Sequence, residues 1–119
     1  MALRRLVKNL RSSNDDLHRE ELADRFDRDR HDTVAIADAP PRTRVRIAGE
    51  VARLRVVPRA GSPSLEVTVD DGTGRAVVVF TGRRAIAGVN PGRGIVLEGM
   101  ARLERNRVVL MNPLYTLLP

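Results

Sequence analysis

The feature that most constrains this fold is a change of hydrophobic period at the tandem prolines Pro40 and Pro41. Before them, apolar residues recur every three or four positions, which is typical of amphipathic helices. After them, short valine-rich segments alternate apolar with polar residues, which indicates strands. Consecutive prolines disfavour helix and mark the boundary. We therefore predict a helical arm and linker over residues 1–41 and an all-β domain over residues 42–119.

The arm contains two candidate helices. Residues 3–11 place four aliphatic side chains at helical spacing with four cations on the opposite side, which predicts a short basic amphipathic helix. Ser13 is followed three residues later by Asp16, a spacing that predicts a new helix start and a second, acidic helix through about Arg28. The sequence leaves open whether the arm is a solvated hairpin, a flexible segment, a partner-docking element or an anion-binding surface.

Five strands are predicted after the prolines. They cover about residues 43–57, 65–70, 75–80, 95–103 and 107–112, with one or two helical turns between 81 and 89 and a tail without strand after 112. Within the first strand the inward alternation slips by one residue near Ala52 and Arg53, so that Leu54 and Val56 become inward-facing. A slip inside a continuous strand requires a bulge, and a small closed barrel requires such a bend in its first strand.

Three segments carry a resemblance to a known family: VRIAGEVARLR, LEVTVDDGTGRAVVVF and NPGRGIVLEGMARLERNRVVL. They resemble OB-fold domains of the tRNA-anticodon-binding type, a family that includes the wedge-like DNA-binding domain of a branched-DNA helicase. The order of three strands, a short helix and a hairpin is also that of the OB-fold. The resemblance covers about residues 43–112 and is most specific at Gly49, the turn 71–74, Pro91, Gly92 and Gly99.

The chain as a whole resembles small stand-alone bacterial OB-fold proteins that bind nucleic acid. This resemblance implies a five-stranded Greek-key barrel with a short helix between the third and fourth strands, preceded by a helical arm. It also implies a binding face on the outside of the second and third strands, framed by the loops that join strands one to two and four to five.

The charge distribution agrees with such a face. Residues 1–41 carry eight basic and nine acidic side chains, whereas residues 42–119 carry thirteen arginines and six acids, a net charge of +7. Arginines, Arg55 among them, surround the predicted frame, where they would attract phosphates and release counterions. We expect the contacts to come first from Arg59, Arg105 and Arg107, and then from Arg44, Arg46, Arg53, Arg75 and Phe80.

Two features limit the strength of that interface. The chain has only three aromatic residues, and the best candidate for stacking on a base, Phe80, fits the core better than the surface. Glu66 and Asp70 are expected to project outward from the second strand and to repel phosphate. We therefore predict weak, sequence-tolerant binding to single-stranded or branched DNA, or to RNA, mainly through the backbone of the nucleic acid.

The composition leaves little for catalysis or cofactor binding. The absence of cysteine excludes disulfides and thiolate-bound metals, and His18 and His31 lack a metal-ligand spacing. The adjacent carboxylates Asp70 and Asp71 fall in a predicted hairpin turn, where such residues serve turn geometry. We predict no enzymatic activity, no metal and no cofactor. The apolar stretches are too short to span a membrane and the first residues lack a signal peptide's apolar centre, so we expect a soluble, cytoplasmic protein.

Other roles compete with nucleic-acid binding. The two outward carboxylates and the scarcity of aromatics favour a protein-docking adaptor that uses the barrel or the arm as its interface. The helix over residues 3–11 also suits, less well, an anionic membrane surface. Its aliphatic side could equally pack against the barrel or against a second copy of the chain, which would give a dimer.

Overall fold

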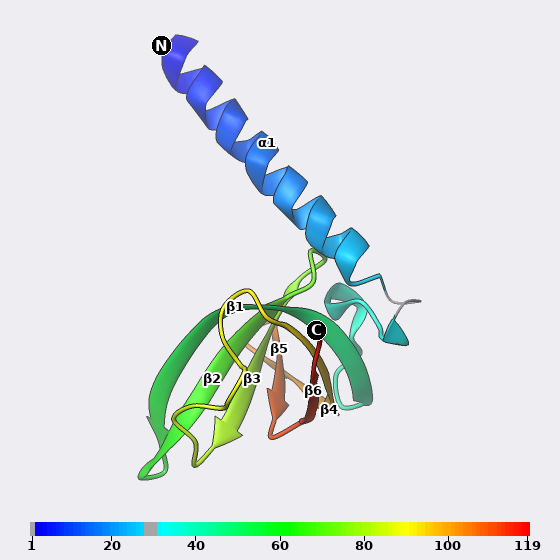
Figure 1. The fold of residues 1–119 in the computed structure, drawn as a ribbon, viewed down its shortest axis with the longest axis vertical. Helices are drawn as coiled ribbons and strands as arrows, with labels where there is room; N and C mark the ends of the chain where they lie inside the picture. The colour runs from blue at the N-terminus through cyan, green and yellow to red at the C-terminus, as the bar shows by residue number, and fades with distance from the viewer. Residues whose placement is uncertain (1, 28–30) are drawn as a thin grey trace.

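The computed structural model describes residues 2–27 and 31–119, and the side chains of these residues from position 14 onward. Figure 1 shows strands that curl around a common interior and one long helix that projects from them. The elements are α1 (Ala2–Arg25), a short 3-10 helix η1 (Ile36–Asp38), β1 (Arg44–Arg59), β2 (Ser62–Asp70), β3 (Arg75–Thr81), β4 (Gly94–Glu104), β5 (Arg107–Met111) and β6 (Leu114–Leu117).

Five of the six strands close into a ring. Their order is β1-β2-β3-β5-β4, and β4 also pairs with β1. Neighbouring strands are antiparallel except β3 and β5, which run parallel. The sixth strand, β6, pairs with β4. The ring confirms the predicted order of five strands and the mostly β character of the chain.

Strand β1 belongs to both halves of the ring. It pairs with β4 through residues 44–50 and with β2 through residues 50–59. The register shifts between Val51 and Arg53, where the sequence pattern predicts a bulge. At Gly49, β1 lies so close to β2 that a Cβ would lie 2.6 Å from Val69 Cγ1, which leaves no room for a side chain. The sharp bend of β1 therefore depends on both the bulge and this glycine.

Aliphatic side chains from alternate strand positions fill the interior of the ring. Ile47, Leu65 and Leu97 are almost completely buried, and each contributes roughly 1.5–3 kcal/mol by leaving water. Leu54 packs against this core as predicted. The prediction for Val56 is wrong: its side chain is 47% exposed. Val56 pairs with the buried Leu65, but it lies in the half of β1 that pairs only with β2, because β4 pairs with residues 44–50, so β1 is an open edge at this position.

The predicted helix between the third and fourth strands is absent. Residues 82–93 form successive tight turns instead, with Val89 N–H donating to the Ile86 carbonyl and Arg93 N–H to the Asn90 carbonyl. Ile86 and Val89 are both buried, so two apolar side chains of this loop pack into the core of the ring. Pro91 and the glycines of this segment interrupt the helical hydrogen-bond ladder after each turn.

The segment predicted as a tail contains a strand. Residues 114–117 pair with residues 95–98 of β4 to form β6. Tyr115 from this strand packs edge-to-face on Phe80, with ring centroids 5.7 Å apart. Such a short run has little periodicity of its own, so the strand is specified by its tertiary pairing and not by its local pattern.

The arm forms one helix, α1, where two were predicted. It runs without interruption from Ala2 to Arg25, so the predicted break at Ser13 is wrong, and it ends three residues before the predicted end at Arg28. Ser, Asn and Asp favour helix starts, but inside a helix each costs only about half a kcal/mol. No glycine or proline occurs in residues 2–27 to stop the helix.

The C-terminal end of α1 packs on the outside of the ring. Leu22 of α1 and Phe26, in the turn that follows the helix, are buried against Ala48 of β1 and Val96 of β4. Ala48 is only 1% exposed because this end of the helix covers it. The turn between β2 and β3 lies directly against the helix backbone, because a Cβ on Gly72 would collide with Arg19 and Ala23.

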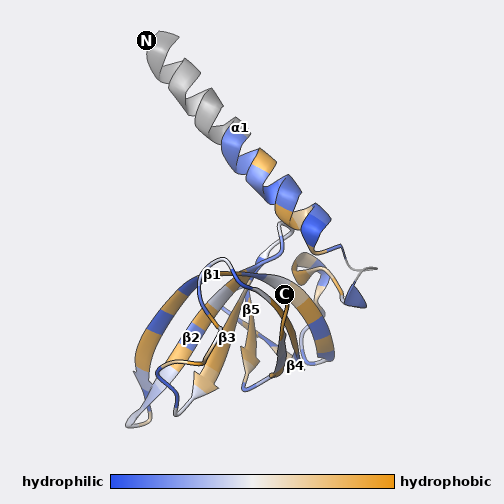
Figure 2. Cartoon of the chain, viewed as in Figure 1, coloured by the Kyte–Doolittle hydropathy of each residue, from blue (hydrophilic) through white to orange (hydrophobic). Residues whose placement is uncertain are grey.

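The hydropathy pattern follows this arrangement. Figure 2 shows apolar positions alternating along the strands, while the part of α1 with described side chains is mainly hydrophilic. None of the helices in the described part of the chain is long and apolar enough to cross a membrane.

Candidate nucleic-acid interface

A groove of about 290 Å³ lies on the outer surface of the ring. Strands β1, β2, β3 and β5 and the hairpin between β4 and β5 contribute to it. It is lined by Arg55, Arg59, Glu66, Val77, Glu104, Arg105, Arg107 and Val109. The three residues expected to be the main contacts, Arg59, Arg105 and Arg107, therefore lie together in one groove.

Strand register explains why these side chains meet. Residues that pair directly across neighbouring strands point to the same face of a sheet. Arg55 pairs with Glu66, and Glu104 pairs with Arg107. Val77 of β3 pairs with Val109 of β5 between them. The outer face of the ring thus presents a row of charged side chains on either side of an apolar strip.

The floor of the groove is aliphatic. Val77, Val79 and Val109 form an apolar cluster separate from the main core, with Met111 packed against it. All three valines are buried, at 6%, 0% and 4% exposure, although they belong to the outer face. No aromatic side chain is among the lining residues. The groove therefore offers bases a narrow apolar strip and guanidinium planes, but no aromatic ring to stack on.

Two-residue hairpins hold the arginines of the rim. The β1–β2 turn is Ala60-Gly61, and the β4–β5 turn is Arg105-Asn106. All four residues have positive φ, between 49° and 80°, as type I′ hairpin turns require. Arg105 adopts φ 51°, which costs a non-glycine residue roughly 1–2 kcal/mol. The rim is thus built from two tight turns, and one of them retains an arginine in a conformation that glycine or asparagine would adopt with less strain.

The carboxylates of the groove are paired. Glu66 lies on the outer face as predicted, but it is only 9% exposed, and its Oε1 is 3.0 Å from Nη2 of Arg55. Glu104 forms an ion pair with Arg102 at 3.6 Å. The expected repulsion of phosphate by Glu66 is therefore partly neutralised. With four arginines and two glutamates, the groove keeps a net charge of +2.

Three groove arginines remain available for a ligand. Within residues 14–27 and 31–119, no acidic side chain forms an ion pair with Arg59, Arg105 or Arg107. A guanidinium presents a planar fork of donors that matches the oxygens of a phosphate. The guanidinium donors of these three side chains are therefore not engaged by carboxylates of the described residues.

Arg55 was part of the predicted arginine frame but not of the expected contacts. The alternation of side chains along β1 is the sequence signal that could have identified Arg55 as a groove residue. Once the bulge at Val51 and Arg53 turns Leu54 inward, Arg53, Arg55 and Arg59 share the outer face. Arg53 pairs with Thr68 beside the groove and does not line it.

The remaining expected contacts lie elsewhere. Arg44 and Arg46 contact Glu98 on the face that β1 shares with β4, and Arg46 also donates to the His31 carbonyl. Phe80 is 6% exposed and belongs to the main core, so it presents no face to a base.

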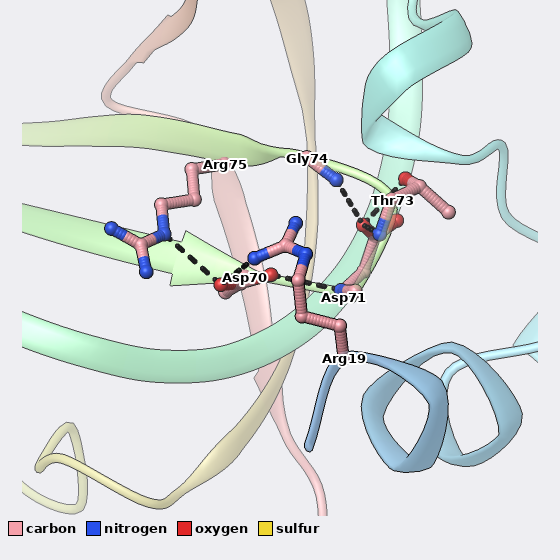
Figure 3. Close-up of polar contacts among 7 residues, drawn as sticks. Arg19, Asp70, Asp71, Thr73, Gly74 and Arg75 are labelled. Carbon is pink, nitrogen blue, oxygen red and sulfur yellow. Dashed lines mark hydrogen bonds and ion pairs between the residues drawn. The ribbon is translucent and has the colours of Figure 1, made fainter. Parts of the chain in front are cut away.

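Arg75 takes part in a charged cluster at the β2–β3 turn (Figure 3). Asp70 Oδ2 lies 3.0 Å from Arg75 Nε and 3.3 Å from Nη1 of Arg19, which comes from α1. Asp70 Oδ1 accepts a hydrogen bond from Gly72 N–H. The cluster therefore joins the helix to the ring, and Arg75 is held at the border between the groove face and α1.

Asp71 organises the same turn. Its Oδ1 accepts hydrogen bonds from the N–H groups of Thr73 and Gly74 and from the Thr73 hydroxyl (Figure 3). Its Oδ2 accepts one from Ile36 N–H at the start of η1. These contacts confirm that Asp70 and Asp71 serve the geometry of the turn.

A second cleft, of about 310 Å³, separates α1 from the ring. Its lining combines His18 and Arg19 with acidic side chains of both α1 and the ring, including Asp15, Glu50 and Asp70. Among the residues with described side chains, no group of three or more histidines and carboxylates is placed to hold a metal ion.

No family model and no curated protein matches the chain. Among solved structures, it is similar to yeast Stn1 and Ten1, with a TM-score of 0.52 and 15% identity over 65% of this chain and 43% of that one. A Replication Protein A heterotrimer bound to ssDNA gives a TM-score of 0.49 at 16% identity, over 64% and 57% of the two chains. The S. pombe Stn1–Ten1 complex gives 0.49 at 22% identity, over 63% and 57%.

These matches span about half the length of the chains found. Together with the closed ring of five strands, the likeness to yeast Stn1 and Ten1 assigns the chain to the OB-fold. At this identity the likeness concerns the fold, and the function has to be argued from the groove itself.

Proposed function

We propose that this chain is a non-enzymatic nucleic-acid-binding OB-fold protein that holds the phosphate backbone of single-stranded or branched DNA, or of RNA, in the groove of Arg55, Arg59, Arg105 and Arg107. The observation that carries the proposal is the convergence of Arg59, Arg105 and Arg107, without acidic partners among the described residues, in one groove beside two tight hairpin turns. Arg53 and Arg75 flank this face and serve as secondary contacts.

The composition of the groove defines how such a ligand would be bound. Arginine forks recognise phosphate oxygens but carry no direct information about base sequence. Without an aromatic platform, the bases gain little from stacking, although guanidinium planes replace part of it. The binding is therefore weak and tolerant of sequence. Arg44, Arg46 and Phe80 have no place in this proposed interface, because they contact Glu98 or the core.

The salt dependence of binding tests this proposal. Three phosphate contacts on a single strand give a slope of log K against log salt of about −2, so raising salt from about 50 to 200 mM weakens binding roughly 20-fold. Labelled single-stranded DNA, forked DNA and single-stranded RNA should be titrated by fluorescence anisotropy at both salt concentrations. The absence of binding to all three at about 50 mM salt would refute the proposal.

The second candidate is a protein-docking adaptor. It is favoured by Glu66 and Glu104 within the groove and by the exposed apolar side chains Met100 and Leu103 on β4, each 56% exposed. A partner that co-purifies in a stable stoichiometric complex after nuclease treatment would favour this role. Loss of every partner on nuclease treatment would argue against it.

A further inference from the structure

Glu66 places a carboxylate beside the apolar strip of the groove. It pairs with Arg55 of β1 on one side and with Val79 of β3 on the other, so its side chain stands between a guanidinium and the valine cluster. Glu66 is only 9% exposed, whereas the side chain of Glu104, the second acid of the groove, is 43% exposed at the end of β4. An acid on the floor of the groove repels phosphate, so it suits a different part of the ligand.

One oxygen of this carboxylate has no partner. Oε1 of Glu66 accepts a hydrogen bond from Arg55 Nη2 at 3.0 Å, and no donor in residues 14–27 and 31–119 bonds Oε2. Oε2 is not enclosed by protein either, because Ser64 Oγ is the only buried side-chain nitrogen or oxygen without a partner in the described part of the chain. A carboxylate accepts hydrogen bonds and donates none. Since Glu66 lines the groove, its Oε2 is available to a donor that the ligand brings.

The parts of a nucleic-acid strand differ in what they offer such an oxygen. Phosphate oxygens and the ring oxygen of the sugar are acceptors, so donors come mainly from the edges of the bases. The Watson–Crick edge of guanine presents two neighbouring donors, N1–H and the N2 amino group. Cytosine and adenine present one amino group beside a ring acceptor, and thymine presents one N–H between two carbonyl oxygens that repel a carboxylate. Guanine is therefore the base that best matches Glu66.

We propose that Glu66 selects guanine at one position of a bound single strand, by accepting hydrogen bonds from its Watson–Crick edge while the face of the base lies on the apolar strip. This inference rests on the proposed binding of nucleic acid by the groove, and it adds one preferred nucleotide to backbone contacts that tolerate any sequence. Val77 and Val109 line the groove and supply the apolar surface for the base. A duplex is excluded at this position, because its guanines already use the same edge to pair with cytosine.

The ion pair with Arg55 allows an acid to lie within a groove that binds phosphates. The guanidinium offsets the charge of the carboxylate, so phosphates on the neighbouring arginines are repelled less. The side chain of Arg55 is itself 56% exposed and lines the groove, so its remaining N–H groups face the ligand. The pair therefore presents an acceptor to a base and donors to the backbone of the same strand.

Base analogues test the selection on the wild-type protein. Fluorescence anisotropy at about 50 mM salt compares a thymine strand of about 15 nucleotides with the same strand carrying guanine at every third position. The guanine strand should bind about fivefold more tightly, at the low end for two hydrogen bonds to one base. Inosine, which lacks only the N2 amino group, should reduce this preference to about twofold, and 7-deazaguanine, which keeps the Watson–Crick edge, should preserve it. Equal affinity for the thymine and guanine strands would overturn the proposal.

Two variants separate the match of donors from the effect of charge. In Glu66→Gln the carboxamide keeps one acceptor oxygen, but its NH₂ group opposes the donors of guanine, so the preference should fall below about twofold. Glu104→Gln removes the same charge from the same groove, and it should tighten binding to both strands alike while the preference of about fivefold remains. Circular dichroism verifies that both variants keep the ring. A preference that survives Glu66→Gln, or an equal loss of preference in both variants, would overturn the assignment to Glu66.

A charge reversal distinguishes failure of this inference from failure of the proposed function. Arg59→Glu/Arg105→Glu should weaken binding of the thymine and guanine strands by a similar factor of at least about ten, and the preference between them should remain. If this variant weakens binding but the wild type does not distinguish the two strands, the groove binds nucleic acid and Glu66 does not select guanine. If the wild type binds neither strand, both the proposed function and this inference are wrong.

Discussion

Asp71 makes the most concentrated set of polar contacts in the described part of the ring. The fall in the free energy of unfolding when its side chain is removed can be calculated from these contacts. The side chain is 3% exposed and accepts four hydrogen bonds, three of them from backbone N–H groups. In Asp71→Ala, the N–H of Ile36 stays buried without a partner, which costs about 2–3 kcal/mol. The N–H groups of Thr73 and Gly74 are nearer to solvent and add about 0.5–1 kcal/mol each. The free energy of unfolding should therefore fall by about 4 kcal/mol.

Asp71→Asn separates geometry from charge. The amide oxygen can still accept the hydrogen bonds of the turn, but the NH₂ group then faces the donor of Ile36. This variant should lose about 2 kcal/mol, half the effect of alanine. Asp38→Ala is a matched control at an exposed position of η1 and should stay within about 0.5 kcal/mol of the wild type.

Urea denaturation followed by circular dichroism measures all three variants. An Asp71→Ala protein within about 1 kcal/mol of the wild type would refute the reasoning, because it would mean that the turn does not depend on this carboxylate. If the alanine and asparagine variants lose the same free energy of unfolding, the charge of Asp71 would be what stabilises the turn, and the positions of its hydrogen-bond acceptors would contribute little.

Three further predictions concern the helix junction and the groove. Gly72→Ala should destabilise the protein by about 2 kcal/mol in the same denaturation assay, because positive φ and contact with the α1 backbone both disfavour a Cβ; an unchanged midpoint would contradict the packing of α1 on this turn. Phe26→Ala should cost about 3 kcal/mol, since Phe26 is 5% exposed; a loss below 1 kcal/mol would show that the helix end is not docked. Glu66→Gln frees Arg55 and should tighten DNA binding about threefold at about 50 mM salt, measured by anisotropy; weaker binding would mean that the Arg55–Glu66 pair positions the ligand.

The ring was predictable because its signals are periodic. Alternation located the first five strands, and the phase slip at Ala52 and Arg53 located the bulge. The elements that were not predicted depend on tertiary contacts. Residues 114–117 become a strand only by pairing with β4, and Ala48 is buried only because α1 lies over it. Ser13 has the residue type of a helix start, but residue type alone does not terminate a helix that has already begun.

The candidate site was predictable to the extent that it follows from the topology. An OB-fold brings the hairpins after β1 and β4 to one face, and the structure places Arg59, Arg105 and Arg107 in one groove there. Sequence alone did not show that Glu66 would be paired with Arg55, because a cross-strand ion pair depends on a register set by the bulge. Arg44 and Arg46 lie away from the groove because of the same bend of β1. Residues 44–50 of this strand lie beside β4, whereas residues 50–59 lie beside β2.

The most direct test of the account is the affinity for a labelled single-stranded DNA of about 20 nucleotides, measured across salt concentrations for two charge-reversed variants. Arg59→Glu/Arg105→Glu changes the groove, and Arg83→Glu/Arg84→Glu makes the same charge change at exposed positions that do not line it. The account predicts at least a tenfold loss and a shallower salt slope for the first, and an affinity within about threefold of the wild type for the second. Equal losses in both variants, or no loss in either, would contradict the claim that this groove binds nucleic acid.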